Sequence, residues 1–502
     1  MAELDPTGGT IQLGDLGLRT PGFSGTAEAT DSVAGPGPLR AVGGTSATFQ
    51  AALERAGMET THVVDLQATL LPGMAAGVPS GRALGGQIDS FELDVPVPNA
   101  GWDQVVLSVD DRGVTTWSFA PRVEGEGAMR GVGASRTFVI RRSEGGPAEL
   151  GAANRSLFGV MGKQVVKVIA VPIGNVLGVG VNSYLEHWEQ THQRDYGIRD
   201  YLPDNYGVEA PYFNDDAARW AELAKGRTLL FVHGTFSRAH GAFNGLPGDT
   251  MLALSTMYEK RVIAFDHRTI SDDPAENIDW LLATIPDGLT LDLDIVCHSR
   301  GGLVARSLAE RIDPPPGSRR IRVHRTALVG ATNNGTILAD VGHWNDLVDS
   351  LSTVLNIVGI AAGETVDLVL AFVRQIIVNA YPQLRGLACM VPGGPFLADL
   401  NGRPRGQNEY LVVASNFEPL DQRLTSYFKD FVRDELFGEK PNDSMVRIDS
   451  VCGTTTPGEF AEVAEQCLLG DEMGIEHSQY FGTRQVADKL VQWLGAGLCV
   501  PA

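Results

Sequence analysis

The sequence predicts an α/β protein whose mostly parallel sheet, flanked by helices, occupies residues 225–502 behind a small antiparallel β-sandwich. Strand-like apolar runs alternate with helical patterns along the second half of the chain, and strands separated by helices pair in parallel. Between about 62 and 142, apolar and polar residues alternate over short segments, which is typical of antiparallel strands. The 502 residues and the 43% hydrophobic content favour two or three domains.

The N-terminal part is expected to contain few helices. Residues 1–44 are rich in Gly, Thr, Pro and Ala and predict a loose tail, and residues 45–59 predict one short helix. The β-sandwich-like domain is assigned to 45–150. The strand signals are an alternation at Phe91, Leu93 and Val95, a hairpin made by Val105–Val109 and Val114–Phe119, and a strand at Thr137–Ile140. Trp102 and Trp117 favour core or edge packing over a ligand platform.

Residues 151–224 predict a linker and a helical segment. Val165–Asn182 is apolar, but Lys167, Pro172, Asn175 and three glycines interrupt it, so a buried or partner-packing segment is favoured over a membrane span. Leu185–Arg194 and Asn214–Ala224 predict helices, the second with Asn214 or Asp215 as its N-cap.

The second domain repeats strand and helix, and then an insertion interrupts the repeat. The insertion, about 337–404, contains two apolar helical stretches, each too short to span a bilayer. Because it follows a sheet strand, we interpret it as a cap over the carboxyl edge of the sheet. The predicted strands are Thr228–Val232, Arg261–Phe265, Leu293–Cys297, Thr326–Val329 and Tyr410–Ala414, and the predicted helices lie near Met251–Tyr258, Pro274–Thr284, Gly302–Ile312 and Thr483–Leu494.

Ser299 lies at the turn between a predicted strand and a predicted helix. The segment Cys297-His298-Ser299-Arg300-Gly301 is close to the G-x-S-x-G nucleophile elbow, in which a sharp turn exposes a serine hydroxyl. The turn requires small residues around the serine, and Gly301 and Gly302 meet that need after it. Cys297 replaces the usual glycine before it. The alternative is a strand-to-helix turn with an inert serine.

A serine hydroxyl becomes nucleophilic when a base takes its proton and an acid orients that base. In α/β proteins with a nucleophile elbow, the base follows the last strand of the sheet. His477 stands in a loop directly before the final helix and meets this condition, whereas His324 and His343 precede the last predicted strand. Asp443, in a turn of the segment Pro-Asn-Asp-Ser-Met-Val, is the preferred acid. The other candidates for the acid are Asp421, Asp449 and Glu418.

Two backbone N–H groups would complete such a site by binding the negative oxygen of the reaction intermediate. One belongs to the residue after the serine, Arg300. The other belongs to the loop after Thr228–Val232, where Gly234 permits a tight turn and Thr235, or alternatively Phe236, presents its N–H.

Several of these segments together resemble the α/β-hydrolase superfamily, in its bacterial lipase and carboxylesterase-like branch. They are L-L-F-V-H-G-T-F, C-H-S-R-G-G-L-V-A-R, V-G-A-T-N-N-G-T, N-D-S-M-V and E-H-S-Q-Y-F. The resemblance covers about 225–495. It implies the α/β-hydrolase fold and Ser299, Asp443 and His477 as a catalytic triad. It departs from the lipase pattern at Asn333 and Asn334.

These residues together predict a serine hydrolase that cleaves carboxylic ester bonds without a cofactor or a metal. The apolar insertion favours a small-molecule or lipid-like ester, and thioesters and amides remain alternatives on the same triad. A second hypothesis is a catalytically silent hydrolase-fold protein that binds a protein partner through its N-terminal β domain.

The net charge, the first residues and the cysteines of the chain indicate its partners and its cellular location. A net charge of -21 argues against nucleic acid as a partner. The first residues lack the basic and apolar regions of a secretory signal, and five scattered cysteines fit reduced thiols, so a cytoplasmic protein without a transmembrane span is expected. In an oxidising setting, Cys452 and Cys467 could pair.

Overall fold

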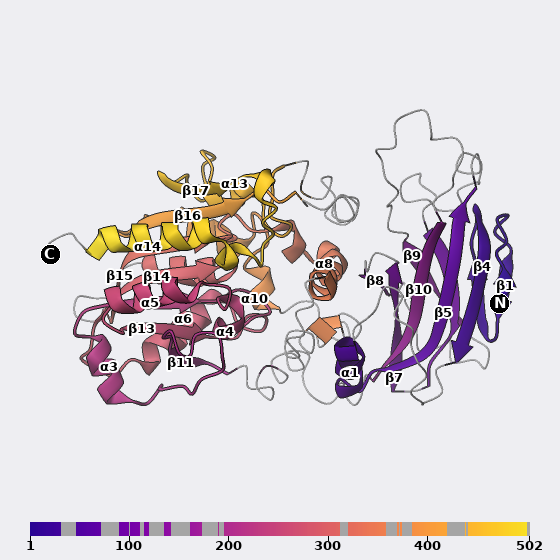
Figure 1. The fold of residues 1–502 in the computed structure, drawn as a ribbon, viewed down its shortest axis with the longest axis horizontal. Coiled ribbons are helices and arrows are strands. Elements are labelled where there is room, and N and C mark those ends of the chain that lie inside the picture. The colour runs from indigo at the N-terminus through magenta and orange to yellow at the C-terminus, as the bar shows by residue number, and fades with distance from the viewer. Residues whose placement is uncertain are drawn as a thin grey trace. The chain divides into compact units, whose positions relative to one another are not determined.

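The computed structural model divides into two compact units (Figure 1). The β unit comprises Met1–Val181, Asn345–Ala380 and Asp421–Phe431, and the α/β unit comprises Asn182–Trp344, Tyr381–Leu420 and Val432–Ala502. The residues that the structure describes are 1–31, 47–71, 90–99, 101–110, 115–119, 135–141, 161–172, 189, 195–311, 320–357, 369–370, 372–373, 384–418, 437 and 440–498.

The β unit contains two antiparallel sheets. In the first, the strand order is β1-β4-β5-β10-β7-β8, and in the second it is β2-β3-β6-β9. The strands of the first sheet are β1 (Ala2–Glu3), β4 (Phe23–Asp31), β5 (Glu59–Leu70), β7 (Trp102–Asp110), β8 (Thr115–Phe119) and β10 (Met161–Pro172). Those of the second are β2 (Thr10–Leu13), β3 (Leu16–Arg19), β6 (Ser90–Pro96) and β9 (Ser135–Arg141). Helix α1 (Ala47–Arg55) precedes β5.

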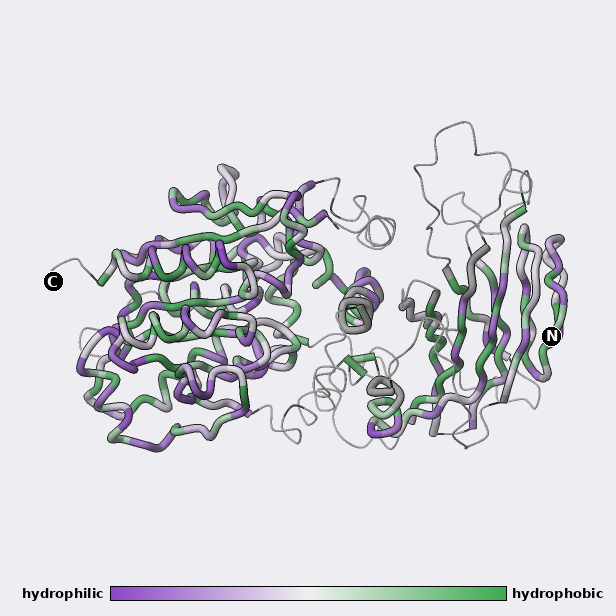
Figure 2. Tube along the Cα trace, in the orientation of Figure 1, coloured by the Kyte–Doolittle hydropathy of each residue, from purple (hydrophilic) through white to green (hydrophobic). Residues whose placement is uncertain are grey.

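Both sheets contribute side chains to one apolar core. Along β6, buried and partly exposed residues alternate, so Phe91, Leu93 and Val95 face inward. They join Val64 of β5 and Val166 of β10 from the other sheet in the same cluster. Hydrophobic and hydrophilic residues alternate along the strands (Figure 2), and the two sheets bury their apolar side chains against one another.

The structure differs from the expected loose tail at residues 1–44, because β1 to β4 lie within residues 2–31. Glycine explains why these strands escaped the sequence pattern. Gly25 of β4 has a φ of 140°, and a Cβ there would lie 2.0 Å from the Gln67 carbonyl oxygen of β5. Glycine is usually a signal of turns and loops, so a strand that needs glycine in its interior is read from the sequence as a loop. Met161–Pro172, expected within a linker and buried segment, is the central strand β10.

Part of the predicted cap belongs to the β unit. Helix α8 (Trp344–Ile357) contains Asp349, whose Oδ1 accepts the backbone N–H of Trp117 at 2.6 Å. Ser352 Oγ of the same helix accepts the Trp117 indole N–H at 2.9 Å. Because the Trp117 side chain is buried and hydrogen-bonded, this residue packs rather than forming an open ligand platform.

The α/β unit has one seven-stranded sheet with the order β11-β13-β12-β14-β15-β16-β17. The edge strand β11 pairs antiparallel with β13, and the other neighbouring strands pair in parallel. The strands are β11 (Gly197–Asp200), β12 (Arg227–Val232), β13 (Val262–Asp266), β14 (Leu291–His298), β15 (Ile321–Val329), β16 (Glu409–Ser415) and β17 (Glu465–Leu469). Because β12 lies between β13 and β14, the strand order reverses there, which is where α/β proteins place their sites.

Helices bury both faces of this sheet. Leu230 and Ile295 share one core with residues of α3, α6 and α7. Phe231 and Val296, one position further along, share the opposite core with residues of α5 and α14. The helices are α3 (Ala217–Leu223), α4 (Ala239–Ala242), α5 (Gly248–Met257), α6 (Pro274–Thr284), α7 (Gly301–Ala309), α10 (Arg385–Ala388), α11 (Pro395–Gly402), α13 (Ile448–Cys452) and α14 (Arg484–Leu498). Short 3₁₀ helices lie at Ile337–Ala339, Val341–His343, Asp471–Met473 and Tyr480–Gly482.

Several sequence expectations change at the boundaries of this unit. Its sheet begins at β11, before residue 225, and ends with β17, which the pattern did not predict. Asp216, rather than Asn214 or Asp215, caps α3 by accepting the N–H of Arg219. The helix expected at Leu185–Arg194 lies outside the described residues except for Glu189.

The structure also bears on the expected cysteines and on the expected lack of a membrane span. Cys452 and Cys467 are free thiols, as are Cys297 and Cys389. The described part of the chain contains no helix of the length and apolar character that a bilayer crossing requires.

Candidate active site

Ser299 occupies a strained turn between β14 and α7. Its φ is 54°, in the left-handed region that residues with a side chain rarely adopt, and its N–H donates to the Val329 carbonyl at 3.0 Å. The neighbouring backbones leave no room for larger residues. A Cβ at Gly301 would lie 2.4 Å from the Val232 carbonyl oxygen, and one at Gly302 would lie 2.5 Å from the Cβ of Ala331. This steric restriction is the physical content of the elbow motif.

Cys297, the unusual residue of the motif, is accommodated by burial. It is fully buried, and its thiol donates to the Ala327 carbonyl on β15 at 3.3 Å. Burial raises the pKa of this thiol, so it stays protonated. The structure therefore tolerates a Cβ at this position of the elbow.

Asp443 and His477 form a buried hydrogen-bonded pair. Nδ1 of His477 lies 2.7 Å from Oδ2 of Asp443, and the His477 backbone N–H donates to the Asp443 carbonyl at 2.9 Å. The other oxygen, Oδ1, accepts the N–H groups of Val446 at 2.7 Å and Met445 at 3.1 Å. These contacts orient the carboxylate toward the imidazole and assign the proton of the neutral ring to Nδ1.

The electrostatics of the pair oppose the effect of burial. Burial alone would raise the pKa of Asp443, but the charge and hydrogen bond of His477, with bonds from Tyr480 and Val446, hold it below its ordinary value. Burial alone would lower the pKa of His477, but the charge and hydrogen bond of Asp443 and the charge of Glu476 raise it. The pair therefore favours an ionised carboxylate beside a histidine of increased basicity.

The imidazole and the serine contact the same stretch of chain. Ser299 bonds to Val329, and the next residue, Gly330, is so close to the pair that a Cβ there would lie 3.2 Å from Cε1 of His477. Within the described residues, no hydrogen bond joins the Ser299 hydroxyl to the imidazole. Such bonds in unliganded sites are often long and shorten when substrate binds.

Two side chains that the sequence interpretation did not include support the pair. The Tyr480 hydroxyl donates to Oδ2 of Asp443 at 2.8 Å. His298 Nε2 lies 2.9 Å from the His477 carbonyl oxygen, and the two rings have centroids 4.7 Å apart. Burial and the nearby His477 lower the pKa of His298 to about 3, so His298 is neutral and donates this bond. His298 directly precedes Ser299 and Tyr480 follows His477 by three positions, but this proximity in the sequence does not indicate the contacts.

The loop after β12 lies against the serine. A Cβ at Gly234 would be 2.7 Å from Ser299 Cβ, so only glycine fits there without a shift. Phe236 has a φ of 59°, and its N–H donates to Thr269 Oγ1 at 3.4 Å. By contrast, the backbone N–H groups of Thr235 and Arg300 have no hydrogen-bond partner among the described residues. Of the two loop candidates, Thr235 therefore has the available donor.

The side chain of Arg300 anchors the turn from within the protein. This fully buried guanidinium donates to the Gly386 carbonyl at 2.8 Å, to Asn277 Oδ1 at 3.1 Å and to the Asp272 carbonyl. It thereby connects the elbow to α10, to α6 and to the loop before α6. The position of the Arg300 N–H is fixed by these contacts.

The alternative acids and histidines lie elsewhere. Asp449 is paired with Lys440 and Arg447, and Asp421 lies outside the described residues. Among the described residues, no hydrogen bond or ion pair joins Glu418 to His477. His324 bonds to Asp292 at 2.8 Å near the amino ends of the strands, and His343 lies in the 3₁₀ helix Val341–His343. The structure brings Asp443, and none of these described residues, to His477.

The strand order, the antiparallel edge strand and the elbow after β14 together define an α/β-hydrolase fold. This confirms the superfamily resemblance of the sequence. Residues 193–495 match the family described as "Domain of unknown function (DUF7379)", and the chain belongs to that family. No curated protein matches the sequence.

The solved structures to which this chain is similar are distant in sequence. Lipase 1 from Pelosinus fermentans is 12% identical, with 55% of this chain and 99% of that chain covered and a TM-score of 0.37. The enol-lactonase from Burkholderia xenovorans is 13% identical, with 55% and 92% covered and a TM-score of 0.28. Phospholipase PlaB from Legionella pneumophila is 14% identical, with 55% and 61% covered and a TM-score of 0.33.

Proposed function

We propose that the protein is a serine hydrolase that cleaves carboxylic ester bonds. The observation that carries the proposal is the buried Asp443–His477 hydrogen bond beside the strained elbow of Ser299. The N–H groups of Thr235 and Arg300, which have no hydrogen-bond partner among the described residues, support it. Arg300 is fully buried, where backbone donors are almost always paired, and Thr235 is partly buried in the loop beside it. A serine, an oriented base and two free donors are the components that acyl transfer requires.

The mechanism follows from the role of each group. Ser299 Oγ attacks the ester carbonyl while Nε2 of His477 takes the hydroxyl proton, and Asp443 stabilises the resulting imidazolium. The N–H groups of Thr235 and Arg300 donate to the oxyanion that forms. The intermediate expels the alcohol, which takes its proton from His477. Water, activated by the same histidine, then releases the carboxylic acid from Ser299. No cofactor enters these steps.

The substrate class follows from the insertion. Its apolar residues (Leu351, Val354, Leu355, Ile357, Val369, Leu370 and Phe372, with Val358, Ile376 and Ile377 outside the described residues) are proposed to form a lid for an acyl chain. In this proposal, the polar substitution Leu355→Ser weakens hydrolysis of long-chain esters more than that of short-chain esters. An equal loss on both, with a lower melting temperature, would instead assign Leu355 to a structural core.

The direct test is hydrolysis of p-nitrophenyl esters from acetate to palmitate, with the matching thioesters and amides in parallel. Wild-type protein is expected to turn over at least one ester, and Ser299→Ala to lose that turnover while keeping its melting temperature. If no acyl substrate reacts, or if Ser299→Ala is as active as the wild type, the proposal is wrong. A preference for thioesters or amides would keep the triad and change the substrate class.

A further inference from the structure

A hollow lies at the edge of the α/β unit's sheet that is opposite the candidate active site. Its volume is about 860 Å³, within the range of small-molecule sites. The amino ends of β15 and β16 and the carboxyl end of α7 line it, through residues such as Ile321, Glu409 and Ala309. Because the sheet is parallel here, Ser299 stands at the other ends of these elements. The hollow is therefore separate from the candidate active site.

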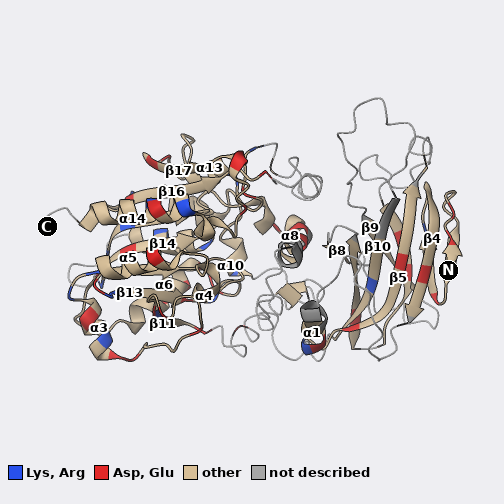
Figure 3. Cartoon of the chain, viewed as in Figure 1, with Lys and Arg blue, Asp and Glu red and all other residues tan. Residues whose placement is uncertain are grey.

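The lining of this hollow is unusual for so acidic a chain. The net charge is -21, and acidic and basic residues are scattered over the α/β unit (Figure 3). Five arginines nevertheless line this one hollow, namely Arg227, Arg311, Arg322, Arg325 and Arg405. Arginine presents a planar fork of donors that matches carboxylate and phosphate oxygens.

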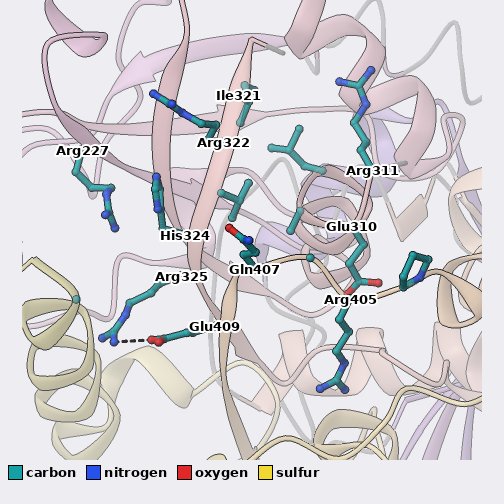
Figure 4. Close-up of a pocket in the computed structure, with 16 residues that line it drawn as sticks. Arg227, Glu310, Arg311, Ile321, Arg322, His324, Arg325, Arg405, Gln407 and Glu409 are labelled. Atoms are coloured by element: carbon teal, nitrogen blue, oxygen red, sulfur yellow. Dashed lines mark ion pairs between the residues drawn. The ribbon is translucent and has the colours of Figure 1, made fainter. Parts of the chain in front are cut away.

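Three of the arginines already have carboxylate partners. Arg227 bonds to Asp294 at 2.9 Å, Arg322 to Asp292 at 2.8 Å and Arg325 to Glu409 at 2.5 Å. In Figure 4, Arg227, Arg322 and Arg325 lie on one side, with Gln407 in the middle. Their charges are balanced, so these side chains shape the hollow without giving it a surplus of positive charge.

The other two arginines have no carboxylate partner among the described residues. Arg311 and Arg405 lie on the far side of Gln407, next to Glu310 (Figure 4). Glu310 is occupied, because both its oxygens bond to Arg306 and Oε1 also accepts the Tyr410 hydroxyl. Arg405 is held in place by a hydrogen bond to the Ala461 carbonyl and by packing over Phe460, with 4.7 Å from Cζ to the ring centroid. One side of the hollow thus carries two guanidinium groups without an ion-pair partner in the described part of the chain, and one of them, Arg405, is preorganised.

We propose that this hollow binds a small organic or inorganic anion with at least two negative charges, a phosphate or polycarboxylate, through Arg311 and Arg405. Two positive charges beside a concave surface attract such an anion and hold it by charge-assisted hydrogen bonds. Gln407 adds an uncharged donor in the centre. Ile321, Val323 and Leu308 offer an apolar surface for the uncharged part of an organic ligand.

The test is calorimetric titration of the full chain with inorganic phosphate, pyrophosphate and citrate at low ionic strength. At least one of these anions is expected to bind, more weakly as salt is added. Arg311→Gln and Arg405→Gln should each weaken binding by about tenfold or more, since each removes a charge-assisted bond. Arg405→Lys should retain more affinity than Arg405→Gln, because it keeps the charge.

Controls separate this site from the candidate active site and from the overall charge. Arg484→Gln removes the same unit charge from an exposed arginine paired with Asp249, and it should bind as the wild type does. Ser299→Ala should also leave binding unchanged. The proposal is overturned if none of the three anions binds, if Arg484→Gln weakens binding as much as Arg311→Gln, or if Ser299→Ala abolishes it. Because ester hydrolysis is not measured, failure of the hydrolase proposal would not affect this result.

Discussion

Asp443 receives every hydrogen bond that a triad acid needs. Val446 and Met445 hold one carboxylate oxygen, and His477 and Tyr480 hold the other. An amide at position 443 keeps the size of the side chain but cannot accept from His477 in the same way, and the wrong tautomer of histidine results. The role of Asp443 can therefore be tested without a large structural change.

Asp443→Asn is expected to lower kcat by a factor on the order of 10³–10⁴, as in serine proteases. The measurement is steady-state hydrolysis of the best ester, with the melting temperature as the control for folding. Asp421→Asn is the matched variant, because Asp421 was the nearest alternative in the sequence. Normal activity in Asp443→Asn with a large loss in Asp421→Asn would transfer the role of the acid to Asp421.

The raised pKa of His477 predicts the pH dependence. Burial opposes the shift, but the neighbouring charges of Asp443 and Glu476 outweigh it and favour the protonated ring. Since the base must be neutral to accept the serine proton, kcat/KM should rise with pH through a midpoint above the ordinary histidine value of about 6.5. In Asp443→Asn the midpoint should move to lower pH. A pH-independent rate would contradict a histidine base.

At the scale of elements, the loop after β12 and the elbow after β14 are packed together through glycine. Gly234 lies against Ser299, and Gly301 and Gly302 lie against the chain after β12 and β15. Five non-glycine residues of the described chain have positive φ. Phe236 and Ser299 lie in these two loops, and Ser444 lies in the turn that carries Asp443. Strain that clusters in this way is typical of functional sites.

Gly234→Ala should therefore lower kcat/KM by about 10²-fold, because the new Cβ displaces the loop that carries the Thr235 N–H. Gly241→Ala is the matched control. Gly241 lies in α4, only seven positions later in the chain, and a Cβ there meets no atom within 4 Å. It should keep full activity and gain up to about 1 kcal/mol in stability. Equal activity of both variants would show that the loop does not position a catalytic donor.

The strands and helices of the α/β unit were largely predictable, because they are buried and apolar. The predicted Pro274–Thr284 is α6 as observed, and Leu293–Cys297 lies within β14. β17 escaped prediction because its strand, Glu465–Leu469, begins with two polar residues and its burial is interrupted. β11 is a four-residue edge strand that begins at Gly197, and it is too short for a periodic signal.

The site was predictable where a local motif carries it. Ser299 and His477 each stand in a recognisable segment. Asp443 could be chosen as the acid because its turn lies between the last predicted strand and His477. Tyr480 and His298 were missed, because their contacts are set by tertiary geometry that spacing does not encode. The glycine-dependent strands at the N-terminus were missed for a similar reason, since the Gln67 backbone that requires Gly25 is 42 positions away.

At the scale of the whole chain, the insertion after β15 is shared between the two units. Residues Asn345–Ala380 belong to the β unit, and Tyr381–Leu420 belong to the α/β unit. Trp117 of β8 holds α8 through its backbone and indole N–H groups. The β unit therefore supports α8, which is part of the insertion.

Trp117→Phe should loosen α8, because it keeps an aromatic ring but removes the bond from the indole N–H to Ser352. Loss of one buried hydrogen bond, worth about 0.5–1.5 kcal/mol, should speed amide hydrogen exchange in 344–357 by up to about tenfold. Trp102→Phe, which changes a partly exposed tryptophan of the same unit, is the control. Unchanged exchange in Trp117→Phe would mean that the indole bond does not hold α8.

The most direct test of the hydrolase proposal is covalent labelling by a fluorophosphonate, followed by mass spectrometry of the peptides. An activated serine reacts with this probe whatever the natural substrate is. The proposal predicts one labelled residue, Ser299, with labelling lost in His477→Ala and strongly slowed in Asp443→Asn. Absence of label on Ser299 in the folded wild-type protein, or equal labelling in His477→Ala, would contradict it.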